Sequence, residues 1–393
     1  MQIVATKMKT LALAAAFAAT TLSGAWAQDI DAALARMKVL MQDQGITLDW
    51  AAADIFGSDA TLTGVTVTSD GQAQPIGDIE LTGITDAEGG YRVGSIAMPT
   101  YTATEAGGTL SLTDLVMEEV FLPNEGVDVA GAEIFFYERA ALGSARLETE
   151  GREVFTLDNL NVEVTPPEGD GELSFTGGAD SFSTDLTVTD DPKHTEVLAR
   201  LGYEQVTGSM AFVGSWAAGD GRLKLSQYDF IVDDAGTLGI AFDVSGYTPA
   251  FIKALRETSE RMAASSEAEQ SRQGLAMLGL MQQLNLHGLE ISFDDSSLTT
   301  KVLEFAAEDQ GISAADVANQ TKAVLPFMMA GINAPQLSQM VTAALSQFLD
   351  DPQSLTIRAA PANPVPFAML LAAGMASPDA LVQQLNLTVT ANE

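Results

Sequence analysis

The segment LTGVT at residues 62–66 returns as LTGIT at residues 81–85. Related segments follow along the chain: LTDLVM (112–117), LDNLNVEV (157–164) and LHGLEI (286–291). The shared pattern is a leucine, any residue, then Gly, Asp or Asn, and then aliphatic residues at alternating positions. This short pattern, repeated at irregular spacing, decides what kind of fold the sequence predicts.

In a regular strand, the leucine and the aliphatic residue three positions later point to opposite faces of the sheet. A small or turn-tolerant residue between them suits a β-bulge, which brings both apolar side chains to the same side. We therefore expect twisted antiparallel sheets with bulged strands between residues 46 and 247. The irregular spacing of the repeats does not fit a strict solenoid.

The hydrophobic period changes from two to the helical value after Tyr247. Thr248 and Pro249 suit the first positions of a helix. Further helices are expected at 301–310, 313–330 with Ser313 and Asp316 as a capping pair, 335–349, and 366–384 with a break at Ser377. Strands are expected between them at 285–293, 354–358 and 386–390. The fold class is therefore α+β, with a β-rich N-terminal two-thirds and a helix-rich C-terminal module that contains a small sheet.

Four segments follow from these changes of pattern. Residues 1–27 are expected to be a signal peptide, and residues 28–165 an N-terminal helix plus a first β unit. Residues 166–247, which begin at two consecutive prolines, are expected to form a second β unit, and residues 248–393 the C-terminal module. The N-terminal helix should pack on the following strands through apolar residues at helical spacing: Ile30, Leu34, Met37, Leu40 and Met41.

The N-terminus has the three parts of a secretory signal peptide. Lys7 and Lys9 give a positive start, TLALAAAFAATTL an apolar stretch, and Ala25-Trp26-Ala27 a cleavage site before Gln28. The apolar segment VPFAMLLAAGMAS near the C-terminus is too short to span a bilayer. We therefore expect a soluble periplasmic or secreted protein that has no transmembrane anchor after removal of residues 1–27.

Composition limits the classes of partner. The formal net charge is −34, which repels phosphate backbones and excludes nucleic acid as an expected partner. The same charge disfavours anionic membrane surfaces. The chain has no cysteine, so its stability must come from burial rather than from disulfides, and 46% hydrophobic residues allow a large core.

No catalytic, cofactor-binding or metal-ligating residue is assigned from the sequence, and no cofactor is expected. The chain has two histidines, His194 and His287, in different segments, and no nucleophile elbow, zinc-protease or P-loop pattern. His194 follows Asp191 at a helix start, where helix capping is the favoured interpretation, and His287 is interpreted as structural or facing solvent. The acidic turns EGDGE (168–172) and DDAGT (233–237) do not fit the EF-hand pattern for calcium. Turn and strand-end chemistry is the favoured interpretation of four aspartate pairs, at 190–191, 233–234, 294–295 and 350–351.

The string QQLNL occurs twice, at 282–286 and at 383–387. In both copies, a helix rich in Ala, Leu and Met should end at the two glutamines and a strand should begin at Asn-Leu. We interpret the pair as a structural joint used twice. Its two strands should be neighbours or near neighbours in one small sheet, with their leucines facing the helices.

Three stretches carry a family resemblance: LARLGYEQVTGSMAFVGSW, DDAGTLGIAFDVSGYTP, and FLDDPQSLTIRAAPANPVPF to the end. They resemble uncharacterised periplasmic proteins of alphaproteobacteria. The β-repeat is more weakly similar to AsmA-like envelope proteins, whose curved β-grooves are associated with lipid handling. A typical AsmA-like protein is longer and keeps an N-terminal membrane helix, and no functional residue transfers to this chain.

The expected function is non-enzymatic binding of an amphiphile, such as a lipid, or of an envelope partner. One-sided Leu, Val and Ile patterns and Met-rich C-terminal helices support a sheet face closed by helices. Two alternatives stay open at this point. The chain could be a purely structural or interaction protein of the cell envelope with no ligand groove, or a hydrolase that lacks a standard motif.

Overall fold

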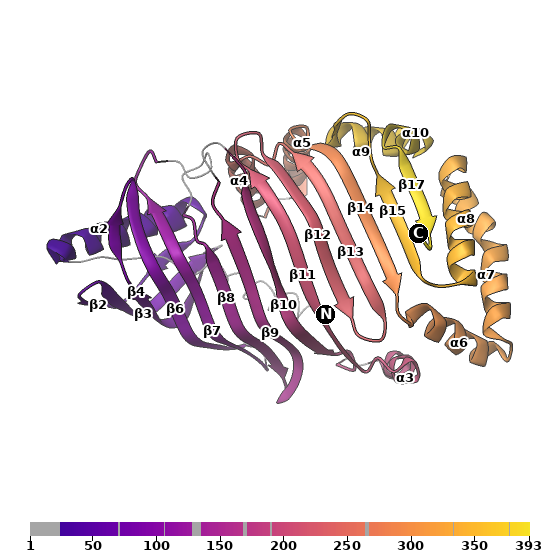
Figure 1. The fold of residues 1–393 in the computed structure, drawn as a ribbon, viewed down its shortest axis with the longest axis horizontal. Coiled ribbons are helices and arrows are strands. Elements are labelled where there is room, and N and C mark those ends of the chain that lie inside the picture. The colour runs from indigo at the N-terminus through magenta and orange to yellow at the C-terminus, as the bar shows by residue number, and fades with distance from the viewer. Residues whose placement is uncertain are drawn as a thin grey trace. The chain divides into compact units, whose positions relative to one another are not determined.

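The computed structural model describes residues 24–69, 71–105, 107–127, 135–167, 171–188, 191–263, 267–332, 334–376 and 378–393. Most of the expected signal peptide, residues 1–23, lies outside the described residues. The chain divides into two compact units, unit 1 at Met1–Ser183 and unit 2 at Thr184–Glu393. The predicted fold class is confirmed: strands dominate the N-terminal two-thirds, and helices gather in the C-terminal part (Figure 1).

Unit 1 is built from one helix and a run of antiparallel strands. Its elements are α2 (Gly24–Asp43), β1 (Thr47–Asp49), β2 (Ala52–Phe56), β3 (Asp59–Ser69), β4 (Gln72–Thr82), β5 (Thr85–Ala87), β6 (Gly90–Glu105), β7 (Gly108–Pro123), β8 (Arg139–Thr149), β9 (Arg152–Thr165) and β10 (Leu173–Asp185). β3 pairs with β1, β2 and β4, and β6 pairs with β4, β5 and β7. The ladder then continues through β8 and β9 to β10.

The predicted bulges are present as register shifts at LTGVT, between Leu62 and Thr66, and beside LHGLEI, between Asp243 and Val244. The other repeated segments keep their register and show a local change of backbone conformation instead. Gly64, Gly83, Asp114 and Asn159 all have positive φ, between 54° and 66°. Opposite Asp114 the ladder skips one pair, because Met98 pairs with Leu115 and Thr100 with Thr113. One residue is passed over on each strand, so the register does not shift. The alternation of buried residues nevertheless changes phase there, because Leu112 and Met117 are both buried.

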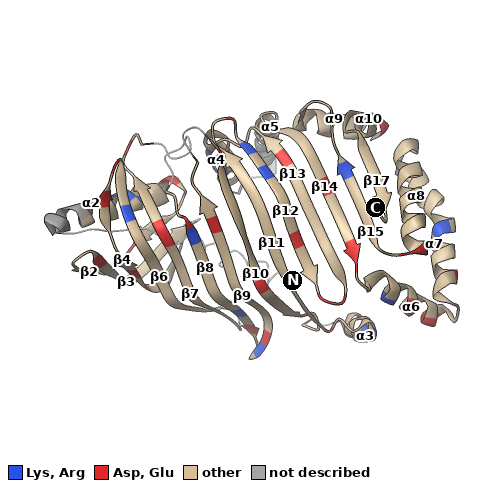
Figure 2. Cartoon of the chain, viewed as in Figure 1, with Lys and Arg blue, Asp and Glu red and all other residues tan. Residues whose placement is uncertain are grey.

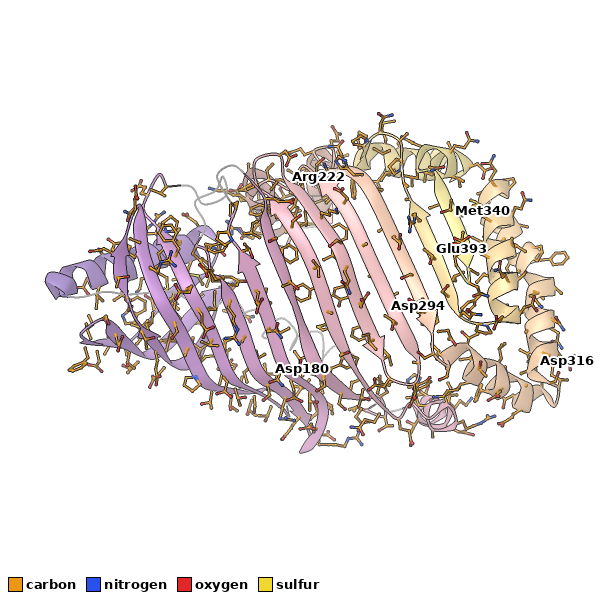
Figure 3. All side chains as sticks on the ribbon, in the orientation of Figure 1. Asp180, Arg222, Asp294, Asp316, Met340 and Glu393 are labelled. Carbon is orange, nitrogen blue, oxygen red and sulfur yellow. The ribbon has the colours of Figure 1, made fainter. Side chains whose placement is uncertain are left out.

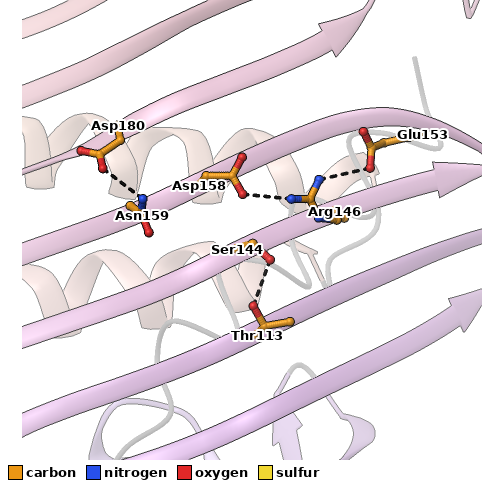
Figure 4. A network of polar contacts seen from close by, with 7 residues as sticks. All are labelled: Thr113, Ser144, Arg146, Glu153, Asp158, Asn159 and Asp180. Carbon is orange, nitrogen blue, oxygen red and sulfur yellow. Dashed lines mark hydrogen bonds and ion pairs between the residues drawn. The ribbon is translucent and has the colours of Figure 1, made fainter.

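Carboxylates accept hydrogen bonds from the backbone N–H groups of two of these positive-φ residues. The Gly64 N–H donates to Asp78 over 2.9 Å, and the Gly83 N–H donates to Asp59 over 2.9 Å. Around Asn159, a polar network crosses the strands (Figure 4). It contains four hydrogen bonds or ion pairs: Thr113–Ser144, Arg146–Glu153, Arg146–Asp158 and Asn159–Asp180. Polar side chains therefore bind at Gly64, Gly83 and Asn159, three of the residues with positive φ.

Helix α2 covers unit 1 as expected and packs against β1 and β7. The five apolar residues predicted to face the strands are all buried, and Gly45 beyond the helix has φ of 81°. The strands bury their own apolar side chains tightly, with Leu62, Val65 and Val67 each 0% exposed. Unit 1 thus has a closed core.

Unit 2 combines antiparallel strands with eight α-helices among its described residues. Its elements are α3 (Pro192–Leu201), β11 (Gln205–Ala217), β12 (Arg222–Val232), β13 (Gly236–Ser245), α4 (Pro249–Ala263), α5 (Glu267–Met281), β14 (Asn285–Asp295), α6 (Leu298–Gln310), α7 (Ala314–Met329), the 3-10 turn η1 (Ala330–Ile332), α8 (Pro335–Asp350), β15 (Ser354–Ala359), β16 (Val365–Pro366), α9 (Phe367–Ala376), α10 (Pro378–Gln384) and β17 (Leu387–Ala391). The strands follow the order β11, β12, β13, β14, β15, β17, with β16 also paired to β14. The capping box predicted at Ser313 and Asp316 is present.

The pairing of β13 with β14 has a consequence for domain organisation. Strands from the expected segments 166–247 and 248–393 belong to one sheet, and the compact units divide at residue 183. The division into three separate domains stays a prediction, with bounds at 28–165, 166–247 and 248–393. None of the described helices is both long and apolar enough to span a bilayer.

Both copies of QQLNL are the predicted joint. α5 ends at Met281 and β14 begins at Asn285, while α10 ends at Gln384 and β17 begins at Leu387. β15 lies between β14 and β17 and pairs with both, so the two strands are near neighbours in one sheet. Leu286 is buried and Leu387 is half-buried.

Candidate functional site

The sheet of unit 2 has one apolar and one polar face. Residues that pair directly across the ladder point to the same side, and successive residues alternate. Phe230 pairs with Leu238, Ile240 with Ile291, and Ile291 with Ile357. We define the open apolar face as this set of residues on β12 to β15: Phe230, Leu238, Ile240, Phe242, Leu289, Ile291 and Ile357.

The intervening residues form a polar face on the other side of the same strands. Arg222 donates two hydrogen bonds to Asp243, from Nε over 2.9 Å and from Nη2 over 2.7 Å. Arg358 forms an ion pair with Glu290 on the neighbouring strand. Arg222 and Asp294 mark opposite ends of these strands (Figure 3). This face carries its charges in cross-strand pairs and is suited to water.

The open apolar face is not filled by the helices of unit 2. Leu238, Ile291 and Ile357 are 39%, 37% and 39% exposed, although they lie on the inner strands β13, β14 and β15. Apolar strand residues of unit 1 such as Leu62 are fully buried. Among the described residues, no helix makes an extended contact with β12 or β13.

Helices border the open apolar face instead of covering it. At β15 and β17, α8 packs through Ala344 and Phe348, and the Phe348 ring lies 6.4 Å from that of Phe293. At the turn end of β12 and β13, Leu198 of α3 and the following Tyr203 pack against Val232.

The opposite ends of the strands are also bordered. The Trp216 indole N–H donates to the Tyr247 carbonyl over 2.9 Å, just before α4. Tyr247 and Phe251 have ring centroids 5.7 Å apart. Leu286, where β14 follows α5, pairs with Val365 before α9, and both are buried. The open apolar face is therefore half-exposed. Helices lie at both ends of β12 and β13 and beside β17 (Figure 1).

His287 makes a cross-strand contact, and His194 lies at the start of a helix that Asp191 caps. The His287 Nε2 lies 2.9 Å from the Ser245 hydroxyl at the bulge between β13 and β14. His194 is exposed in the first turn of α3, and Asp191 caps that helix by accepting from the Lys193 N–H over 3.0 Å. No described contact joins either histidine to a nucleophile other than Ser245.

The aspartate pairs at 233–234, 294–295 and 350–351 supply turn, cap and ion-pair contacts. Asp233 accepts from the Thr207 hydroxyl over 2.7 Å, and Asp295 accepts from the Thr299 N–H over 2.8 Å. Asp350 forms an ion pair with Lys322. Residues 168–170 of the EGDGE turn, and Asp190, lie outside the described residues. Within the described ranges, no group of three or more His, Asp and Glu side chains could hold a metal ion.

Two carboxyl groups of unit 2 have pKa values below the usual range. Hydrogen bonds from Arg222 lower the pKa of Asp243, and Ser313 lowers the pKa of Asp316 through its hydroxyl and its backbone N–H. Both shifts favour the ionised form that an ion pair and a helix cap require. Neither group is suited to act as a neutral acid.

The leucine and isoleucine alternation in LGIAFDV (238–244) and LEISF (289–293) is the sequence signal of the open apolar face. The pattern indicates which residues share a side, but not that the side stays uncovered. The structure therefore identifies Leu238, Ile291 and Ile357 as site residues that were not singled out from the sequence.

Comparison with known proteins places unit 2 in context. A family model described as an uncharacterized protein matches residues 229–392. The matched region runs from β12 to β17 and includes every residue of the open apolar face. No curated protein matches the chain.

Proposed function

We propose that this chain is a non-enzymatic periplasmic protein that binds an amphiphile on the open apolar face of unit 2. The observation that supports it is the exposure of Leu238, Ile291 and Ile357 in the middle of a sheet whose borders are covered by helices. Inner strands normally bury such residues, and an exposed apolar patch bordered by polar surface marks a binding site.

The chemistry of the face favours an alkyl chain over other ligands. Its residues are aliphatic or phenylalanine and offer no side-chain hydrogen-bond donor or acceptor. A net charge of −34 opposes nucleic acid. The signal-peptide features of residues 1–27, and the resemblance to alphaproteobacterial periplasmic and AsmA-like proteins, support the compartment and the ligand class.

The test uses two isoleucines of equal exposure on opposite faces of the same sheet. Ile291 lies on the open apolar face and Ile231 on the polar face, and each is 37% exposed. Ile→Thr keeps the β-branched shape but introduces a hydroxyl. Titration of residues 28–393 with a fluorescent fatty acid should give about three- to tenfold weaker binding for Ile291→Thr. Ile231→Thr should bind as the wild type does.

Native protein gives a second and independent measurement. Chain purified from its host, extracted with organic solvent and analysed by mass spectrometry should release a lipid at near-stoichiometric amount. Protein that is consistently empty and also takes up no fatty acid would contradict the proposal. That result would favour the alternative of a structural or interaction protein, because a protein partner would then cover the face.

A further inference from the structure

Lys301 of α6 lies at the turn end of the strands that carry the open apolar face. Its Nζ is 3.3 Å from the Tyr203 hydroxyl and 3.2 Å from the Asp234 carbonyl oxygen, and it lies 4.3 Å from the centre of the Tyr203 ring. The Tyr203 hydroxyl also donates to the Asp234 carbonyl, over 2.6 Å. Tyr203 is buried and Lys301 is half-buried. The ammonium group is therefore held in a fixed place by a hairpin turn and an aromatic ring.

Tyr203 belongs to a buried cluster on the same side of the sheet as the open apolar face. Val206 and Val232 pack against that cluster. Val232 is two residues after Phe230, so it points to the side of the open apolar face. Val206 points to that side as well, because Val232 pairs with Gly208 two residues further on. A rise of about 3.4 Å per residue puts Phe230 about 7 Å along β12 from this border.

The charge of Lys301 is not neutralised by a described carboxylate. Lys301 is the one basic residue of α6, and among the described residues it forms no ion pair (Figure 2). Arg200 of α3, by contrast, forms ion pairs with two carboxylates of α6. An ammonium group has three N–H donors, and the Tyr203 hydroxyl and the Asp234 carbonyl occupy two of them. The third donor is available to an anion.

We propose that Lys301 binds the headgroup of the amphiphile, and that this headgroup is anionic, as the carboxylate of a fatty acid is. This inference rests on the proposed function. A headgroup at Lys301 lets the alkyl chain run over Leu238 and Ile291, away from the turn. The net charge of −34 repels an anion in general, so a half-buried cation beside the face is what would hold one there.

The opposite end of the strands carries no comparable group among its described border residues. Tyr247, Phe251, Leu286 and Val365 are aromatic or aliphatic. The Trp216 indole N–H is already bonded to the Tyr247 carbonyl, and α9 carries no Asp, Glu, Lys or Arg. The headgroup is therefore assigned to the turn end, and the end of the alkyl chain to the aromatic border.

The test compares a fluorescent fatty acid with its methyl ester at about pH 8, where the carboxyl group of the acid is ionised. The two ligands share the alkyl chain and the fluorophore and differ in headgroup charge. Lys301→Met keeps an unbranched side chain and removes the charge. It should weaken binding of the acid to residues 28–393 about five- to tenfold, an effect between that of a surface ion pair and that of a buried one. Binding of the ester should be unchanged.

Two further variants are the controls. Lys301→Arg keeps the charge and should bind the acid more tightly than Lys301→Met does. Lys253→Met on α4 makes the same change of net charge at an exposed lysine, and it should bind both ligands as the wild type does. Circular dichroism and thermal unfolding check that all three variants fold.

An affinity label tests the assignment without any substitution. The N-hydroxysuccinimide ester of the fatty acid acylates an amine near the bound headgroup, forming an amide and releasing N-hydroxysuccinimide. Peptide mass spectrometry of the wild type should find the label mainly on Lys301, rather than on the exposed Lys193, Lys224 and Lys253. Excess fatty acid should prevent this labelling.

The outcomes separate this inference from the proposed function. A wild type that binds neither ligand would refute the proposed function and this inference with it. If the wild type binds both ligands, three results would refute the headgroup assignment alone: an equal loss of acid and ester in Lys301→Met, no loss in that variant, or the same loss of acid in Lys253→Met. Acylation mainly at an exposed lysine would refute it as well.

Discussion

Among single residues, Arg222 and Asp243 form the best-defined ion pair of the polar face. Because these hydrogen bonds lower the pKa of Asp243, they stabilise the fold above the ordinary carboxyl pKa of about 4. That stability is lost as the pH falls through the lowered pKa. Asp243→Asn should lower the free energy of unfolding by about 1 kcal/mol at pH 7, and the loss should shrink below about pH 4. Urea unfolding at both pH values measures this, with Asp294→Asn as control. An equal loss at both pH values would contradict the assignment.

Gly246 is required where β13 ends beside the first QQLNL joint. Its φ is 92°, and a Cβ atom there would overlap the carbonyl oxygen of Gln283. Gly246→Ala should therefore lower the free energy of unfolding by more than about 3 kcal/mol. Gly219 has no atom within 4 Å of such a Cβ, so Gly219→Ala should cost little. Thermal unfolding of the two variants measures the difference, and similar melting temperatures would show that the backbone relaxes around Gly246.

At the scale of elements, the two QQLNL joints have the same form and different packing. Leu286 is 6% exposed, whereas Leu387 is half-buried in the last strand. Leu286→Ala should cost about 2–5 kcal/mol of unfolding free energy, and Leu387→Ala clearly less. Neither should act through a specific activity, because the joints carry no nucleophile or ligand set. Urea titrations measure both losses, and a larger cost at Leu387 would contradict the packing.

Asp114 in β7 has a left-handed backbone conformation, with φ of 54°. Its side chain packs over Gly143 of β8, 3.0 Å from where a Cβ would lie. Asp114→Gly should be neutral or slightly stabilising, because glycine adopts positive φ without strain. Asp114→Val should lower the free energy of unfolding by about 1–2 kcal/mol, since a β-branched residue resists this conformation. Equal stability of the two variants would mean that the strand does not require the left-handed conformation at this position.

Across the whole molecule, local sequence patterns predicted the strands and helices, but not which strand faces are covered by other elements. The Leu-x-[Gly/Asp/Asn] pattern predicted the register shift at Gly64, because backbone preference and side-chain alternation act within a few residues. Leu62 and Leu238 are both strand leucines, yet one is 0% and the other 39% exposed. That difference arises from which elements pack on which strand, a long-range property that periodicity does not encode. The candidate site therefore became visible only in the structure.

The acidic excess predicts how the whole molecule responds to salt. The chain has 53 acidic and 19 basic residues, so most carboxylates have no basic partner and repel one another in the compact state. Salt weakens this repulsion more than it weakens the few surface ion pairs. Raising NaCl from about 0.02 M to about 0.5 M at pH 7 should therefore raise the melting temperature by a few degrees. Near the pI of about 4.1 the same salt step should have little effect, because the net charge is close to zero. Scanning calorimetry at the two pH values measures both, and a fall in melting temperature at pH 7 would mean that the ion pairs outweigh the repulsion.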